Sequence, residues 1–215
     1  PGIAFPSGAM EEIQFRYSFA CQFVADKNVI EIGFGAGYGV VDIAARADKY
    51  LGIDLLEVNR MLAKERLVDA KLLDRANVVC GEATEIPVAA TSADILIAFA
   101  MIYYVDVSKF FCEANRVLKP DGRFVFCQTN PLAINFSPSR NTIAYYSRTE
   151  INHLLREQGF SCEIYGIPEL DNSRSKKTSI MKKIKGFFKN RASGLYSYMR
   201  RRLTKYDYLP EKILL

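Results

Sequence analysis

The feature that most constrains this 215-residue chain is a glycine-rich turn directly after a short apolar run. Residues 29–39 read VIEIGFGAGYG, so a strand-like segment leads into glycines and then into a helical pattern. Glycines at such a turn permit positive φ and let a ligand approach the backbone, while the following helix offers unpaired N–H groups. The sequence therefore predicts a strand, a ligand-binding loop and a crossover helix.

The spacing of these glycines narrows the class of ligand. Dinucleotide loops read G-x-G-x-x-G, and a third glycine counted from Gly33 would stand at position 38, where this chain has Tyr38. The observed spacing is G-x-G-x-G, through Gly35 and Gly37. A nicotinamide-dependent dehydrogenase is accordingly disfavoured.

Acidic residues lie at or directly after the ends of the first three predicted strands. Glu31 stands two residues before the first glycine, Asp54 ends the second apolar run, and Glu82 follows the third. An acid at the tip of the second strand is placed to accept hydrogen bonds from ribose hydroxyls. The simpler alternative is that Asp54 caps a helix beginning near Leu56. Because Asp54 occurs together with the glycine loop, we favour a nucleoside ligand.

Apolar runs alternate with helical patterns along the chain, which predicts an α/β fold with a doubly wound, mostly parallel, Rossmann-like sheet and helices on both faces. We expect strands at 28–32, 49–53, 77–80, 94–99, 123–128 and 160–166. We expect helices at 8–24, 38–46, 56–69, 107–118 and 148–158. The Asn-, Pro- and Ser-rich stretch 130–142 predicts an ordered loop over the carboxyl edge of the sheet.

Two further motifs accompany the glycine loop: EIPV at 85–88 with SAD at 92–94, and RVLKPDGR at 116–123. With them, residues from about 10 to 166 resemble the class I S-adenosylmethionine (SAM)-dependent methyltransferases of the type 11 family. The second motif resembles the structural "RVLKPGG" turn, although Asp121 and Arg123 replace glycines. The resemblance implies SAM as cofactor and S-adenosylhomocysteine as product. It implies cofactor contacts from Tyr17, Glu31, Gly33, Gly35, Gly37, Asp54, Leu55, Glu82, Ala83, Ala98 and Phe99.

The resemblance also places the methyl acceptor beside the segment after the fourth strand. A sulfonium methyl is already activated, so transfer chiefly needs alignment, and a base only where the acceptor loses a proton. No catalytic residue is assigned; the candidates are Tyr103, Tyr104, Asp106 and His153. For Asp106 we favour a role as the cap of the helix that begins at Val107. For His153 we favour a position on the surface or in the core, without a catalytic role. Candidate acceptor contacts are Arg16, Tyr103, Tyr104, Asn130, Arg140 and Tyr146.

The N-terminal helix at 8–24 is expected to close over SAM as a lid. Its RYSFA segment at 16–20 resembles relatives associated with sugar metabolism. We therefore predict methyl transfer to an oxygen or nitrogen of a small molecule, with a sugar or sugar nucleotide as first choice. The alternative is a helix that only packs its aromatic face on the sheet.

Charge divides the chain in two. Residues 173–215 carry 13 Lys and Arg against 2 Asp and Glu, whereas residues 1–172 carry 16 against 22. We predict a SAM-binding domain at 1–172 and a basic amphipathic extension at 173–215. Over 173–205 this extension suits an anionic membrane surface or an acidic partner, and the alternative is a helical lid on the domain. Five scattered cysteines without a C-x-x-C pair favour reduced thiols, a cytoplasmic location and no metal site. The protein would be peripheral at the membrane if the extension binds there.

Two rival functions stay open. One is a non-catalytic SAM-binding protein that serves membrane or partner binding, and the other an RNA-binding methyltransferase that uses the basic extension. Nucleic acid as a methyl acceptor is disfavoured, since the Asn/Asp-Pro-Pro-aromatic segment of amino-methylating DNA enzymes is replaced by FAMI at 99–102. The acceptor, the methylated atom, the need for a base or metal and the oligomeric state stay open.

Overall fold

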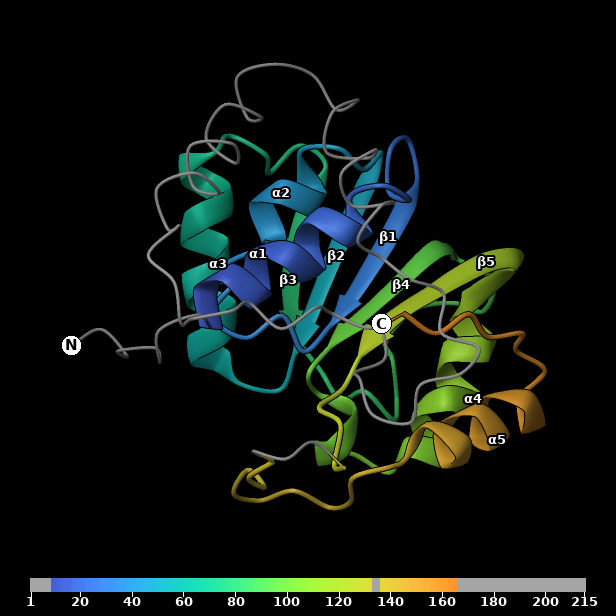
Figure 1. Cartoon of the computed structure of the whole chain (residues 1–215). Helices are drawn as coiled ribbons and strands as arrows, with labels where there is room; N and C mark the ends of the chain where they lie inside the picture. The colour runs from blue at the N-terminus through green and yellow to red at the C-terminus, as the bar shows by residue number, and fades with distance from the viewer. Residues whose placement is uncertain (1–8, 133–135, 166–215) are drawn as a thin grey trace.

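The computed structural model describes residues 9–132 and 136–165, and their core is a five-stranded parallel sheet (Figure 1). The strand order is β3-β2-β1-β4-β5, so the direction of winding reverses between β1 and β4. This confirms the predicted doubly wound, Rossmann-like sheet, in which ligands bind beyond the carboxyl ends of the strands near the reversal. The strands are β1 Asn28–Ile32, β2 Lys49–Asp54, β3 Ala76–Cys80, β4 Ala93–Phe99 and β5 Leu118–Cys127.

The helices form two layers around the sheet (Figure 1). On one face lie α1 (Ala9–Ala20), α2 (Val40–Ala44) and α3 (Glu57–Asp69). On the other face lie α4 (Val107–Val117) and α5 (Arg148–Glu157). Because both faces are covered, β1 and β4 are buried along almost their whole length, as expected of central parallel strands with continuous apolar runs.

The helices of the second layer begin where their sequences supply caps. The Asp106 carboxylate accepts the Lys109 N–H at 3.1 Å, which starts α4. Ser147 and Glu150 form a reciprocal capping box that starts α5. Residues at helical spacing then face the sheet, and the buried ones on α4 are Val107, Phe110, Phe111, Ala114 and Val117.

Most predicted bounds agree with the structure to within two residues, and β5 is the main exception among the strands that form. It begins at Leu118 instead of 123, because Leu118 pairs with Ala93 ahead of a register shift. In the first layer α1 ends at Ala20 instead of 24, and a turn follows it.

The predicted sixth strand at 160–166 is wrong over the part that the structure describes, since Phe160–Tyr165 forms no strand. The Phe160 N–H remains bonded to the carbonyl of Leu155, which extends the turn at the end of α5. Phe160, Cys162 and Ile164 alternate against the second core cluster, so the strand-like pattern reflects burial. Of the residues from Phe160 to Tyr165, Tyr165 alone forms a β-bridge. Gly166, the predicted domain boundary and the whole basic extension lie outside the described residues.

Two other findings bear on the charge and cysteine analysis. All five cysteines are free thiols. Within residues 9–132 and 136–165, no helix combines the length and the apolar character needed to cross a bilayer.

Candidate functional site

The glycine loop leaves β1 at the carboxyl edge of the sheet. Gly35 has φ of +58°, a conformation that side chains with a Cβ rarely adopt. A Cβ built on Gly35 would meet no protein atom within 4 Å, so this part of the backbone faces open space. Gly39 differs, because a Cβ there would lie 2.1 Å from the Tyr17 ring. The loop is therefore accessible at Gly35 and covered by α1 at Gly39.

Asp54 ties the glycine loop to the start of α3. One carboxylate oxygen accepts the Gly35 N–H at 2.8 Å, while the other accepts the Leu56 N–H at 3.0 Å and the Asn59 side-chain amide at 2.9 Å. The side chain is 7% exposed. Both interpretations of Asp54 thus have a counterpart in the structure: it holds the beginning of α3, and it lies against the loop at the edge where a ribose is expected.

Glu31 is buried at 1% exposure and accepts two phenolic hydrogen bonds. The Tyr17 hydroxyl of α1 donates at 2.5 Å and the Tyr50 hydroxyl of β2 at 2.7 Å. Gly52 is the register partner of Glu31 in β2, and a Cβ there would lie 2.9 Å from the Tyr50 hydroxyl. The missing side chain at Gly52 therefore makes room for this contact.

Burial dominates the electrostatics of this group. It raises the pKa of Glu31 to about 7, although the hydrogen bonds from Tyr17 and Tyr50 lower it and nearby Asp54 raises it further. Burial and the neighbouring Glu31 also hold the pKa of Tyr17 and of Tyr50 well above the ordinary range. The two phenols therefore stay protonated and act as donors to Glu31.

Aromatic rings line the end of β4. Phe99 meets Tyr17 edge-to-face, with ring centroids 5.2 Å apart. Beyond it, the Tyr103 ring lies 4.6 Å from that of Tyr104 and 5.0 Å from that of Tyr145. Tyr103 is buried, whereas Tyr104 is 40% exposed. The structure thus brings the two predicted tyrosines together and adds Tyr145 from the loop over the sheet edge.

Arg16 on α1 acts electrostatically on groups at the ends of β4 and β5. Burial raises the pKa of the Tyr103 phenol and of the Cys127 thiol, and the nearby Arg16 guanidinium offsets part of both rises. The Nε of Arg16 is buried with no hydrogen-bond partner, and one terminal nitrogen pairs with Glu12 at 3.3 Å. A cation with spare donor capacity thus lies near the carboxyl ends of β4 and β5.

The other cofactor candidates vary in exposure. Leu55 is 66% exposed directly after Asp54, whereas Ala83 and Ala98 are buried. Glu82 is exposed and forms an isolated antiparallel bridge with Glu85. Leu55 thus presents an exposed apolar side chain beside the Asp54 carboxylate.

Several acceptor and catalytic candidates are exposed or engaged in local contacts. His153 is on the outer surface of α5, 3.3 Å from Glu157, and the Asp106 carboxylate is engaged as the cap of α4. Arg140 is exposed, and the Tyr146 ring packs on the second core cluster. The Asn130 side chain accepts the N–H of Leu132 within its own loop. None of these contacts joins one of the five residues to the Gly35 loop.

Sequence reasoning missed three polar partners at this edge. Tyr50 and Asn59 bind the two predicted acids, and buried Gln128 donates to the carbonyl of Tyr146 at 2.6 Å while its Oε1 has no partner. The available signal was chemical: a tyrosine or glutamine in a buried strand needs a hydrogen-bond partner. As a whole, the edge offers donors, acceptors and aromatic walls for binding and orienting a ligand.

Comparison with known proteins assigns a family to this arrangement. A family model described as a methyltransferase domain matches residues 30–126. A protein of Mycolicibacterium smegmatis named "probable S-adenosylmethionine-dependent methyltransferase" is 30% identical over 170 residues, covering 76% of this chain and 63% of that protein. The chain spans between about half and two thirds of the length of the first curated relatives that it matches.

Solved structures share the fold at low identity. A SAM-dependent methyltransferase from Aquifex aeolicus superposes with a TM-score of 0.61 at 19% identity, over 76% of this chain and 88% of that one. The cyclase SpnF superposes with a TM-score of 0.63 at 19% identity, over 76% of this chain and 61% of that one. Since a cyclase shares this fold, the fold alone does not determine the reaction.

Proposed function

Because residues 30–126 form a methyltransferase domain of the SAM-dependent class I family, we propose that this chain binds SAM at the carboxyl edge of its sheet and methylates a small molecule. S-adenosylhomocysteine is then the product. The atom methylated is an oxygen or a nitrogen, and the acceptor is a sugar or sugar nucleotide.

The observation that carries the proposal is the pairing of Gly35 with Asp54. The backbone at Gly35 faces space that a Cβ would enter, and its N–H is held by a carboxylate at the end of β2. A ribose beside Asp54 and an adenine against Leu55 fit this arrangement. Glu31 then acts through Tyr17, because its two oxygens hold tyrosine hydroxyls, and so fixes α1 over the amino-acid end of the cofactor.

Arg16 supports an acceptor with an anionic group. Its guanidinium has an unpartnered buried Nε and lies near Tyr103, next to the predicted acceptor position. Planar guanidinium groups bind phosphate and carboxylate through two parallel hydrogen bonds. The phosphates of a sugar nucleotide meet this requirement.

The mechanism that we propose depends on alignment. SAM, when bound, supplies a methyl group already activated by the sulfonium. The tyrosines at 103 and 104 orient the acceptor and exclude water from it. Burial raises the pKa of Tyr103, so its hydroxyl stays protonated near neutral pH and serves as a hydrogen-bond donor. Asp106 caps α4 and His153 is on the surface, so neither is assigned as a base.

A second candidate function is SAM binding without methyl transfer. The likeness to the cyclase SpnF supports this candidate, because the same fold occurs in a protein with a different named activity. The RNA-binding and membrane-binding alternatives depend on residues 173–215, which lie outside the described residues, and they stay predictions.

Calorimetric titration of SAM into Asp54→Ala tests the cofactor site. Loss of a charge-assisted hydrogen bond to ribose should weaken binding by about 1–3 kcal/mol. Asp121→Ala removes an exposed acid elsewhere, and Asn59→Ala removes one internal partner of Asp54 but keeps its carboxylate; both should bind nearly as the parent does. Undiminished affinity in Asp54→Ala would contradict the placement. Binding without conversion of SAM to S-adenosylhomocysteine, across anionic and neutral sugars, would favour the second candidate.

A further inference from the structure

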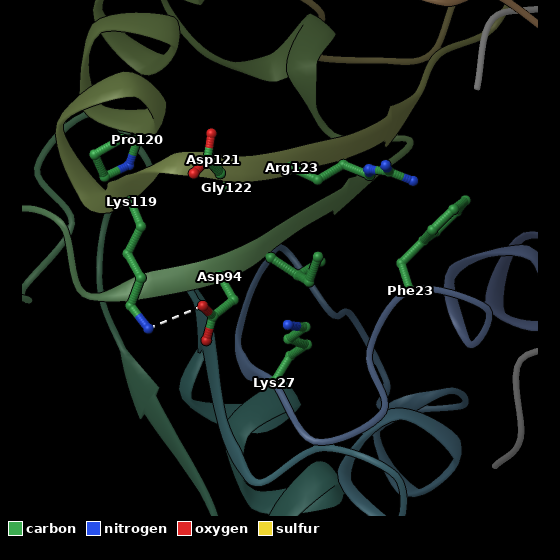
Figure 2. Close-up of a pocket in the computed structure, with 9 residues that line it drawn as sticks. Phe23, Lys27, Asp94, Lys119, Pro120, Asp121, Gly122 and Arg123 are labelled. Atoms are coloured by element: carbon green, nitrogen blue, oxygen red, sulfur yellow. Dashed lines mark hydrogen bonds and ion pairs between the residues drawn. The ribbon is translucent and has the colours of Figure 1, made fainter.

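A hollow of about 490 Å³ lies at the amino ends of β4 and β5 (Figure 2). It is at the opposite edge of the sheet from the glycine loop, since all five strands are parallel. Its volume is within the range of small-molecule sites. The residues that line it come from β4, β5 and the turn after α1; those with functional side chains are Phe23, Lys27, Asp94, Lys119, Asp121 and Arg123.

Two of the charges in this hollow neutralise each other. The Asp94 carboxylate accepts the Lys119 ammonium at 2.9 Å through one oxygen and the backbone N–H of Asn28 at 2.9 Å through the other. Although burial alone would raise the pKa of Asp94, these hydrogen bonds and nearby Lys27 hold it below the ordinary value. In Figure 2 the carboxylate of Asp121 points away from Lys27 and Asp94. The acids of the hollow are therefore engaged or directed elsewhere.

Lys27 and Arg123 supply the surplus positive charge. Within residues 9–132 and 136–165, neither forms an ion pair. The Arg123 guanidinium lies over the Phe23 ring, 4.4 Å from its centroid (Figure 2). Stacking on a ring holds the guanidinium plane and leaves its N–H edge available for a ligand.

The charge of the surroundings makes this local surplus informative. Residues 1–172 carry more acidic than basic side chains, 22 against 16. The hollow is lined by three basic and two acidic residues, so its lining is weakly positive within an acidic domain. The basic extension at 173–215 is a poor occupant, because like charges repel. Lys27 and Arg123 both line the hollow, with the Arg123 guanidinium extended toward Phe23 and Lys27 nearer Asp94 (Figure 2). Ammonium and guanidinium groups are the donors that phosphate prefers.

We propose that this hollow binds a small phosphate-bearing ligand, with the phosphate held by Lys27 and Arg123. The site is separate from the SAM site, and the proposal does not depend on methyl transfer. The apolar walls, which include Phe23 and Ile95, contact the remainder of the ligand.

Pyrophosphate titration of the full-length chain, followed through the backbone amide signals of Lys27, Asp121 and Gly122, tests the proposal. This readout reports on the hollow itself. The double variant Lys27→Gln/Arg123→Gln should weaken the affinity about tenfold or more. Phe23→Leu, which keeps every charge, should weaken it about two- to fivefold.

The charge-matched control is Lys64→Gln/Arg156→Gln, on the exposed surfaces of α3 and α5, which should change the affinity less than about twofold. Equal loss in the two double variants would overturn the proposal, because it would show attraction to overall charge. Absent shifts at the three amides would also overturn it. Citrate binding as tight as that of pyrophosphate would exclude the phosphate assignment.

Discussion

The two edges of the parallel sheet shift the pKa of a carboxylate in opposite directions. At the carboxyl edge, Glu31 is buried beneath two tyrosine hydroxyls and its pKa is raised to about 7. At the amino edge, Asp94 is more exposed, paired with Lys119, and its pKa is lowered. Both carboxylates accept two hydrogen bonds. The difference therefore lies in solvent access and in the charge of the donor, and it separates a site built on neutral donors from one built on cations.

The largest effect that we expect at the carboxyl edge is that of Gly35→Val. Valine at a φ of +58° is strained, and its side chain would enter the open space beside Asp54. SAM affinity should fall more than about a hundredfold, which is about 2.7 kcal/mol. Equilibrium binding of SAM or S-adenosylhomocysteine measures it.

Gly159→Val is the matched control for this change. Gly159 also has positive φ, +82°, and open space around it, but it lies after α5. The control should lose stability to backbone strain and keep its affinity for SAM. Equal loss of binding in both variants would mean that strain, and not obstruction of the loop, explains the result.

An effect of comparable size, on stability instead of binding, concerns Glu31 and pH. Its pKa is higher in the folded protein than the ordinary 4.5, so the folded state binds the proton more tightly and stability falls as pH rises from about 4.5 to 7. A shift of this size corresponds to about 3 kcal/mol. Glu31→Gln, which keeps a hydrogen-bonding group between Tyr17 and Tyr50, should lack this loss. Urea unfolding of both proteins across that pH range gives the comparison, and parallel pH profiles would refute it.

The smallest effect is expected at the amino edge and has the opposite sign. Because the pKa of Asp94 is lowered on folding, its contribution is present above the unfolded pKa and is lost as pH falls. Its ion pair is partly exposed, so Asp94→Asn should cost no more than about 1 kcal/mol at pH 7. Urea unfolding at pH 7 and at pH 3 should show the difference between parent and variant shrinking with acid. A difference that grows on acidification would contradict the contrast between the two edges.

Local sequence predicts much of this molecule. The bounds of β1 and the position of the glycine loop follow from a contiguous run of residues, and the cap at Asp106 follows from one side chain before a helix. The match to the methyltransferase domain confirms the family expected from these motifs.

Contacts that depend on strand register could not be predicted in this way. Tyr50 reaches Glu31 because β1 and β2 are parallel and Gly52 stands opposite the acid, which no single segment reveals. The segment 160–165 shows the reverse problem. Its alternating apolar residues pack on the core, yet the segment forms no continuous strand and a β-bridge occurs at Tyr165 alone. The alternation therefore indicated burial and not a full ladder of hydrogen bonds.

The contacts of Asp54 have a thermodynamic consequence for ligand entry. The carboxylate already accepts N–H groups from Gly35 and Leu56, so the loop keeps its shape through internal bonds. When a ligand hydroxyl binds this carboxylate, hydrogen bonds to water are replaced by a hydrogen bond between ligand and protein. The net heat released is therefore smaller than the energy of one hydrogen bond. The loss of backbone conformational entropy in this step is small, because the loop is already ordered before the ligand binds. Association beside Gly35 and Asp54 should therefore show a modest enthalpy and a small entropic penalty.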